Sequence, residues 1–87
     1  MNETLMRVTL SVDIPTLGPR IKAARESRGL SPTKVAALAD MSAANLYRIE
    51  SEETKSLPWD TLKRLGEALG ENFDADVIAA LKDISAP

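Results

Sequence analysis

Apolar and polar residues alternate from Met6 to Ile14, near the start of the chain. The apolar positions of this alternation are Met6, Val8, Leu10, Val12 and Ile14. A period of two predicts a half-buried β-strand, which we expect from Leu5 to Ile14, ending at Pro15. The rest of the sequence shows no second strand pattern. Because a lone strand leaves its backbone N–H and C=O groups unpaired, we expect it to pair with the same strand of a second copy. An extended, unpaired arm is the alternative.

After Pro15 the apolar residues recur every three to four positions, which predicts helices. The first helix is expected to start between Thr16 and Pro19 and to end at Gly29. The others are expected at 32–38, at 43–50, from Pro58 to just before Gly70, and after an Asn72 cap. Their expected apolar positions include Ile21, Ala24, Val35, Ala36, Leu38, Leu46, Ile49, Leu62, Leu65, Leu69, Val77, Ile78 and Leu81. The sequence thus predicts an all-α, compact five-helix domain over 16–84. A strand arm over 1–15 precedes it, and a frayed tail over 85–87 follows.

Residues 30–50 read as two short helices around a tight turn. Ser31 and Ser42 are good N-caps, and Asp40 tolerates the left-handed backbone that such a turn needs. The second helix places small residues first and hydrogen-bonding residues after them, on faces other than the one holding Leu46 and Ile49. That arrangement is suited to the DNA major groove.

Four stretches of the chain carry a family resemblance. In order, and with nearly the family's spacing, they are LGPRIKAARESRGLS, VAALADMS, LYRIE and LPWDTLKRLGEALG. Together they resemble the lambda-repressor-like, or Xre/Cro, helix-turn-helix family between Leu17 and Leu81. The resemblance implies a DNA-binding protein in which the start of the helix over 43–50 faces base edges. The positions that it implies for base contact are Ser42, Ala43, Ala44 and Arg48.

Other residues are expected to touch the DNA backbone or to support the fold. The backbone candidates are Ser31, Thr33, Lys34, Asn45, Tyr47 and Lys55. The first three stand at a helix N-terminus, where free N–H groups attract a phosphate. For Arg48 an ion pair is the alternative role, for Asn45 helix capping, and for Tyr47 ring packing. The resemblance also implies a structural ion pair between Arg25 and Glu50, in which a guanidinium satisfies a carboxylate with two bonds.

Two features depart from the family pattern. Pro32 stands where many members have a Gln that contacts the DNA backbone. The loop over 51–56 is acidic and one residue longer than the common pattern. Glu52 and Glu53 would repel phosphates if they faced the duplex, leaving only Lys55 to help. We therefore expect modest affinity for each subunit.

Composition narrows the function further. The chain has 87 residues, no Cys and no His, so thiolate chemistry and the commonest general base are absent. We expect no metal, no cofactor and no enzymatic activity. The net charge is −2, but residues 1–49 hold seven basic and four acidic groups (+3), whereas residues 50–87 hold four and nine (−5). This asymmetry favours DNA binding through one face. Without a membrane-length apolar run or a leader pattern, we expect a soluble cytoplasmic protein.

These observations favour a sequence-specific transcriptional regulator that binds double-stranded DNA as a homodimer. Its dimerisation residues would be Met6, Val8, Leu10 and Val12. One alternative is a protein-interaction or antitoxin-like module on the same fold, with weak or no DNA binding. Another is a ribbon-helix-helix protein, in which Arg7, Thr9 and Ser11 would read the groove from a two-stranded ribbon.

Overall fold

The computed structural model describes residues 4–6 and 11–85, which form five α-helices. They are α1 (Leu17–Ser27), α2 (Pro32–Leu38), α3 (Ala43–Glu50), α4 (Trp59–Leu69) and α5 (Phe73–Ser85). The all-α fold class is therefore confirmed for the helical domain, and the bounds of α2 and α3 agree with the prediction. None of the helices described is long and apolar enough to cross a membrane.

Short polar side chains start three of the helices. The Ser31 hydroxyl accepts a hydrogen bond from the Lys34 N–H, and the Ser42 hydroxyl accepts one from the Asn45 N–H, each at 3.1 Å. At the start of α5, the Asn72 amide oxygen accepts the N–H of Ala75 at 3.3 Å. Each bond satisfies an N–H that the first helical turn leaves unpaired, so these serines and Asn72 specify where the helices begin.

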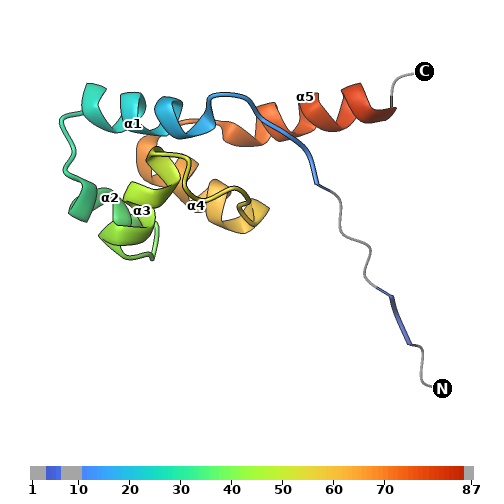
Figure 1. Ribbon diagram of the computed structural model, residues 1–87, viewed down its shortest axis with the longest axis horizontal. Coiled ribbons are helices and arrows are strands. Elements are labelled where there is room, and N and C mark those ends of the chain that lie inside the picture. Colours follow the sequence, from blue (N-terminus) through green and yellow to red (C-terminus); the bar gives the residue numbers. More distant parts are fainter. Residues whose placement is uncertain (1–3, 7–10, 86–87) are drawn as a thin grey trace.

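One apolar core joins the five helices. Its largest fully buried side chains are Ile21, Val35, Leu46, Leu65 and Leu69. Burying each of them contributes about 1.5–3 kcal/mol relative to exposure. Figure 1 shows α2 and α3 gathered at one end of the domain, while the last turns of α5 extend toward the other end. The helix-turn-helix pair is thus well separated from the C-terminal part of α5.

The turn between α2 and α3 has the geometry of a helix C-cap. Asp40 adopts a left-handed φ of 57°, the Asp40 N–H bonds the Ala37 carbonyl, and the Met41 N–H bonds the Ala36 carbonyl. This is the Schellman arrangement, in which glycine is the usual left-handed residue. Asp40 fills that position, as its tolerance for this conformation predicted.

Three side-chain or boundary predictions were wrong. Leu38 is 53 % exposed because Val35, Ala36 and Ala39 face the core, and Leu38 lies outside the arc that they span, about one-sixth of a turn beyond Val35. Ile78 is 46 % exposed because α5 packs through Phe73, Val77 and Leu81 instead. Ser85, expected in a frayed tail, is the last residue of α5.

The expected strand is not present in the described part of the N-terminal segment. Residues 4–6 and 11–14 have no regular secondary structure, and positions 7–10, including Val8 and Leu10, lie outside the described residues. A strand exists only through hydrogen bonds to a neighbour, and a single chain with no second strand pattern offers none. Val12 and Ile14 nevertheless pack against the core, and Leu5 and Met6 are exposed.

Candidate nucleic-acid interface

Helix α3 has one buried face and one exposed face. Leu46 and Ile49 anchor it in the core, with exposures of 0 and 7 %. Ala44 and Arg48, one helical turn apart, lie at the centre of the exposed face. Of the other predicted base-contacting residues, Ser42 is exposed and Ala43 is half-buried, and the Ser42 hydroxyl is occupied as the N-cap.

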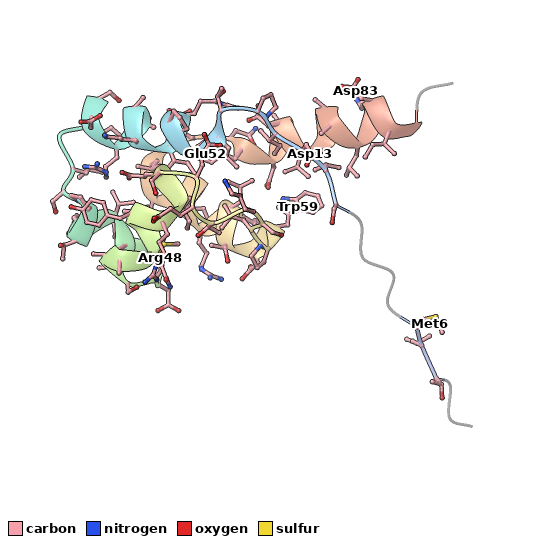
Figure 2. The ribbon with its side chains drawn as sticks, viewed as in Figure 1. Met6, Asp13, Arg48, Glu52, Trp59 and Asp83 are labelled. Atoms are coloured by element: carbon pink, nitrogen blue, oxygen red, sulfur yellow. The ribbon has the colours of Figure 1, made fainter. Side chains whose placement is uncertain are left out.

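Arg48 is held in place on this face by Asn45. One terminal guanidinium nitrogen of Arg48 donates to the Asn45 side-chain oxygen at 3.0 Å. Because the acceptor is a neutral amide, this bond orients Arg48 without neutralising its charge. No ion pair found in the described residues uses Arg48, and the Asn45 side chain does not cap α3. Figure 2 shows Arg48 on α3, at the opposite end of the molecule from Asp83 of α5.

Tyr47 lies at the edge of the exposed face of α3. Its side chain is 56 % exposed, so its ring is not packed into the core. The predicted role of Tyr47 as a phosphate contact stays a prediction, and its exposure is what such a contact requires.

The N-terminus of α2 offers fewer free N–H groups than the sequence suggests. Ser31, Thr33 and Lys34 are all exposed, as a phosphate contact requires. However, Pro32 has no N–H, and the Lys34 N–H is bonded to the Ser31 hydroxyl. Of the first three helical positions, only Thr33 keeps an unshared N–H. The Lys34 ammonium is therefore the main attraction for an anion here.

Arg25 and Glu50 come together as a buried ion pair beneath the interface. Arg25 Nε and Nη2 donate to the two Glu50 carboxylate oxygens at 2.8 and 3.0 Å, and Nη1 donates to the Leu30 carbonyl at 3.1 Å. The two residues are 8 and 7 % exposed. The hydrogen bonds to Glu50 raise the pKa of Arg25 above its ordinary value, so its charge persists wherever the domain is folded. The pair ties α1 to the end of α3 and to the segment leading into α2.

The acidic loop after α3 turns one of its carboxylates toward α1. Glu52 has a left-handed φ of 62°, and its Cγ lies 2.6 Å from the point where a Cβ on Gly18 would stand. Figure 2 shows Glu52 beside α1. The first turn of a helix carries a partial positive charge that favours such a carboxylate. Glu53 instead accepts a 3.4 Å hydrogen bond from Ser51 within the loop.

Lys55 lies away from the exposed face of α3. It lines a groove of about 980 Å³ together with residues of the N-terminal segment, including Val12 and Ile14, and with Trp59 and Leu81. The structure therefore separates Lys55 from the other predicted backbone contacts.

Sequence reasoning missed the contact that supports the turn before α3. Arg64 Nε donates to the Ala39 carbonyl at 3.0 Å, and the same guanidinium pairs with Asp60 one turn earlier on α4. Ala39 is the C-cap of α2, where carbonyls lack helical partners. No local pattern links Arg64 to a turn 25 residues earlier, so only the folded chain reveals this contact.

These features define a class: a five-helix domain whose second and third helices form a helix-turn-helix, with the exposed face of α3 outward. The family described as "Helix-turn-helix domain" matches residues 16–81, which is most of the chain. The chain belongs to this helix-turn-helix family, in agreement with its lambda-repressor-like resemblance. No curated protein matches the sequence.

Proposed function

We propose that this protein is a sequence-specific transcriptional regulator that binds double-stranded DNA as a homodimer, with α3 in the major groove. The observation that carries the proposal is the exposed face of α3, where Arg48 is oriented by Asn45 and has no ion pair with a carboxylate among the described residues. A recognition helix needs such a face on a rigid support. The buried Arg25–Glu50 pair supplies that support at the end of α3.

Arg48 is the strongest candidate for base readout. A guanidinium can donate two hydrogen bonds to O6 and N7 of guanine, which contributes about 1–3 kcal/mol of discrimination. Ala44, one turn earlier on the same face, suits contact with a thymine methyl group. Ser42 and Ala43 complete the base-facing set at the start of the helix.

Backbone contacts position the helix but contribute little sequence information. Tyr47, Asn45 and Thr33 supply neutral donors on this side of the protein, and Lys34 supplies a charge. If Lys34 neutralises one phosphate in each subunit, two phosphates are involved, because Lys55 lies in the groove away from this face. The logarithm of the association constant then falls with the logarithm of salt concentration with a slope of about −1.8.

Binding as a dimer follows from this small set of contacts. Two subunits related by a two-fold axis read two half-sites about one helical turn of DNA apart, which adds their contacts on one duplex. In the proposal, the alternating residues Met6, Val8, Leu10 and Val12 pair the N-terminal segments of the two copies.

Selection from randomised duplex DNA, followed by fluorescence anisotropy on the selected site, tests the proposal. We expect a two-fold symmetric site. Arg48→Ala removes a contact of about 1–3 kcal/mol from each of the two subunits, so it should weaken binding by the dimer about 30-fold or more and relax the preference at one base pair in each half-site. Ala44→Glu should abolish binding, because a carboxylate on that face repels the duplex. The charge-matched control is Lys63→Ala on α4, which should change affinity less than twofold (roughly 0.4 kcal/mol).

The opposite outcome has a specific meaning. If no sequence is enriched at low salt, the protein is better described as a protein-interaction or antitoxin-like module. The excess of acidic groups in residues 50–87 favours that second function. If Arg48→Ala has no effect while Arg7→Ala abolishes binding, the ribbon-helix-helix description replaces the proposal.

A further inference from the structure

An apolar groove lies beside α5, away from the exposed face of α3. The N-terminal segment forms one wall, the loop before α4 forms another, and α5 closes it. Its apolar lining includes Val12, Ile14, Leu57, Trp59, Val77 and Leu81. Trp59 is the single tryptophan of the chain and is 49 % exposed, with its indole N–H donating to Asp74 at 2.6 Å. A hydrogen-bonded indole with half of its surface uncovered is a good wall for an apolar ligand.

The N-terminal wall of the groove also has an open backbone. Residues 11–14 make no backbone–backbone hydrogen bond with any other described residue. Their N–H and C=O groups are available to a neighbouring strand, which is how an extended segment recruits another chain. The groove therefore offers both an apolar surface and a hydrogen-bonding edge to the same occupant.

The sequence of the arm matches what this edge requires. Leu5 and Met6 are 86 and 89 % exposed, and the alternation of apolar residues continues from Met6 to Ile14. Figures 1 and 2 show the described residues around Met6 far from the helices. A fold-back within one chain needs a turn, and Ser11 is the single turn-favouring residue between Met6 and Val12, where the sequence has no Gly, Pro, Asn or Asp. A strand from another molecule meets this edge without such a turn.

Only certain registers keep the apolar faces together. In an antiparallel pair, directly opposite residues point to the same side, so the residue numbers of each pair must have an even sum. The register that pairs all five alternating positions, 6 to 14, with one another is the one in which the numbers add to 20. It places position 6 of one copy opposite position 14 of the other.

We infer that the groove beside α5 receives the N-terminal arm of a second copy of this chain, with Met6 of one copy seated against Ile14 of the other. The inference rests on the proposed homodimer and names the surface that completes it. A two-stranded ribbon alone is marginally stable in water, whereas a ribbon laid on Leu57 and Trp59 also buries apolar surface. Of the described residues of α3, only Ile49 on its buried face lines the groove, so the exposed faces of both recognition helices stay accessible.

The absence of cysteine from the natural sequence allows a clean test by disulfide trapping. Met6→Cys and Ile14→Cys chains are prepared separately, mixed and oxidised. We expect a disulfide-linked dimer from the mixture. Each variant alone should stay unlinked, because identical positions lie eight residues, or about 27 Å, apart in this register. The matched control is Met6→Cys mixed with Asp13→Cys, since position 13 points to the other side of the ribbon.

Trp59 fluorescence in the natural chain gives a second, independent readout. As the protein concentration rises through dimerisation, we expect the emission to move to shorter wavelength and acrylamide quenching to fall. A chain lacking residues 1–13 should remain monomeric and show neither change.

Several results would overturn the inference. Equal trapping with Asp13→Cys would show that the arms have no fixed register. Trapping by Met6→Cys alone would show either parallel pairing or an antiparallel register in which the numbers add to 12. A dimer that binds paired half-sites but leaves Trp59 unaffected would refute the groove while leaving the proposed function intact. Specific trapping in a protein that selects no DNA sequence would support the groove and refute the proposed DNA-binding function.

Discussion

Replacing Arg25 with Ala should destabilise the domain severely. The change removes two charge-assisted hydrogen bonds of 2.8 and 3.0 Å and leaves the Glu50 carboxylate, 7 % exposed, without its cation. Breaking one partner of a buried pair typically costs about 3–5 kcal/mol. At roughly 0.05–0.15 kcal/mol per residue, a domain of 87 residues has a total stability of about 4–13 kcal/mol. Arg25→Ala therefore removes a large share of that stability.

Urea unfolding followed by circular dichroism measures this loss through the free energy of unfolding. The matched control is Arg28→Ala at the C-cap of the same helix. The Arg28–Glu71 pair has side-chain exposures of 39 and 41 %, so its loss should cost only about 0.2–1 kcal/mol. The double variant Arg25→Met/Glu50→Leu removes both charges and should recover most of the stability lost in Arg25→Ala.

The reasoning fails if Arg25→Ala is no more destabilising than Arg28→Ala. It also fails if the double variant is no more stable than Arg25→Ala, because the cost would then not arise from a stranded buried carboxylate. Measuring DNA affinity at a temperature where each variant is folded separates the support of α3 from global stability.

Two further predictions concern contacts around the helix-turn-helix. Gly18→Ala should cost about 1–3 kcal/mol, because the new Cβ would lie 2.6 and 2.8 Å from the Ile49 and Glu50 carbonyl oxygens. Gly29→Ala, with nothing within 4 Å and only a left-handed φ of 63° to strain, should cost less in the same thermal unfolding assay. Arg64→Met should cost about 1–2 kcal/mol by removing the donor to the Ala39 carbonyl. Lys63→Met, an exposed neighbour, should unfold like the natural chain, and equal losses in both would contradict a role for that hydrogen bond.

The sequence allowed the helices to be predicted well because their determinants are local. Ser31, Ser42 and Asn72 cap the residues that immediately follow them, and the apolar spacing of α3 and α4 depends only on helical geometry. The exposed face of α3 follows for the same reason, since Leu46 and Ile49 determine which side is buried.

Predictions about individual exposures and loops were less successful. Leu38 and Ile78 are apolar at helical spacing, yet both are exposed because their neighbours on the same helices are better placed toward the core. From its charge, Glu52 was expected to repel DNA phosphates if it faced the duplex. In the structure its backbone is left-handed and its side chain lies beside the N-terminus of α1. The spacing of apolar residues alone predicts neither these exposures nor the position of Glu52.

The sequence by itself determined the five helices, the helix-turn-helix and the residues on the outer face of its second helix. The Arg25–Glu50 pair beneath that helix was expected from the family resemblance, whereas only the tertiary structure revealed the support that Arg64 gives to its turn. It also brought the N-terminal segment, Trp59 and α5 together around one groove. The physical reason is range: capping and periodicity act within a few residues, whereas buried ion pairs and grooves join residues that are distant in sequence and meet only when the core forms.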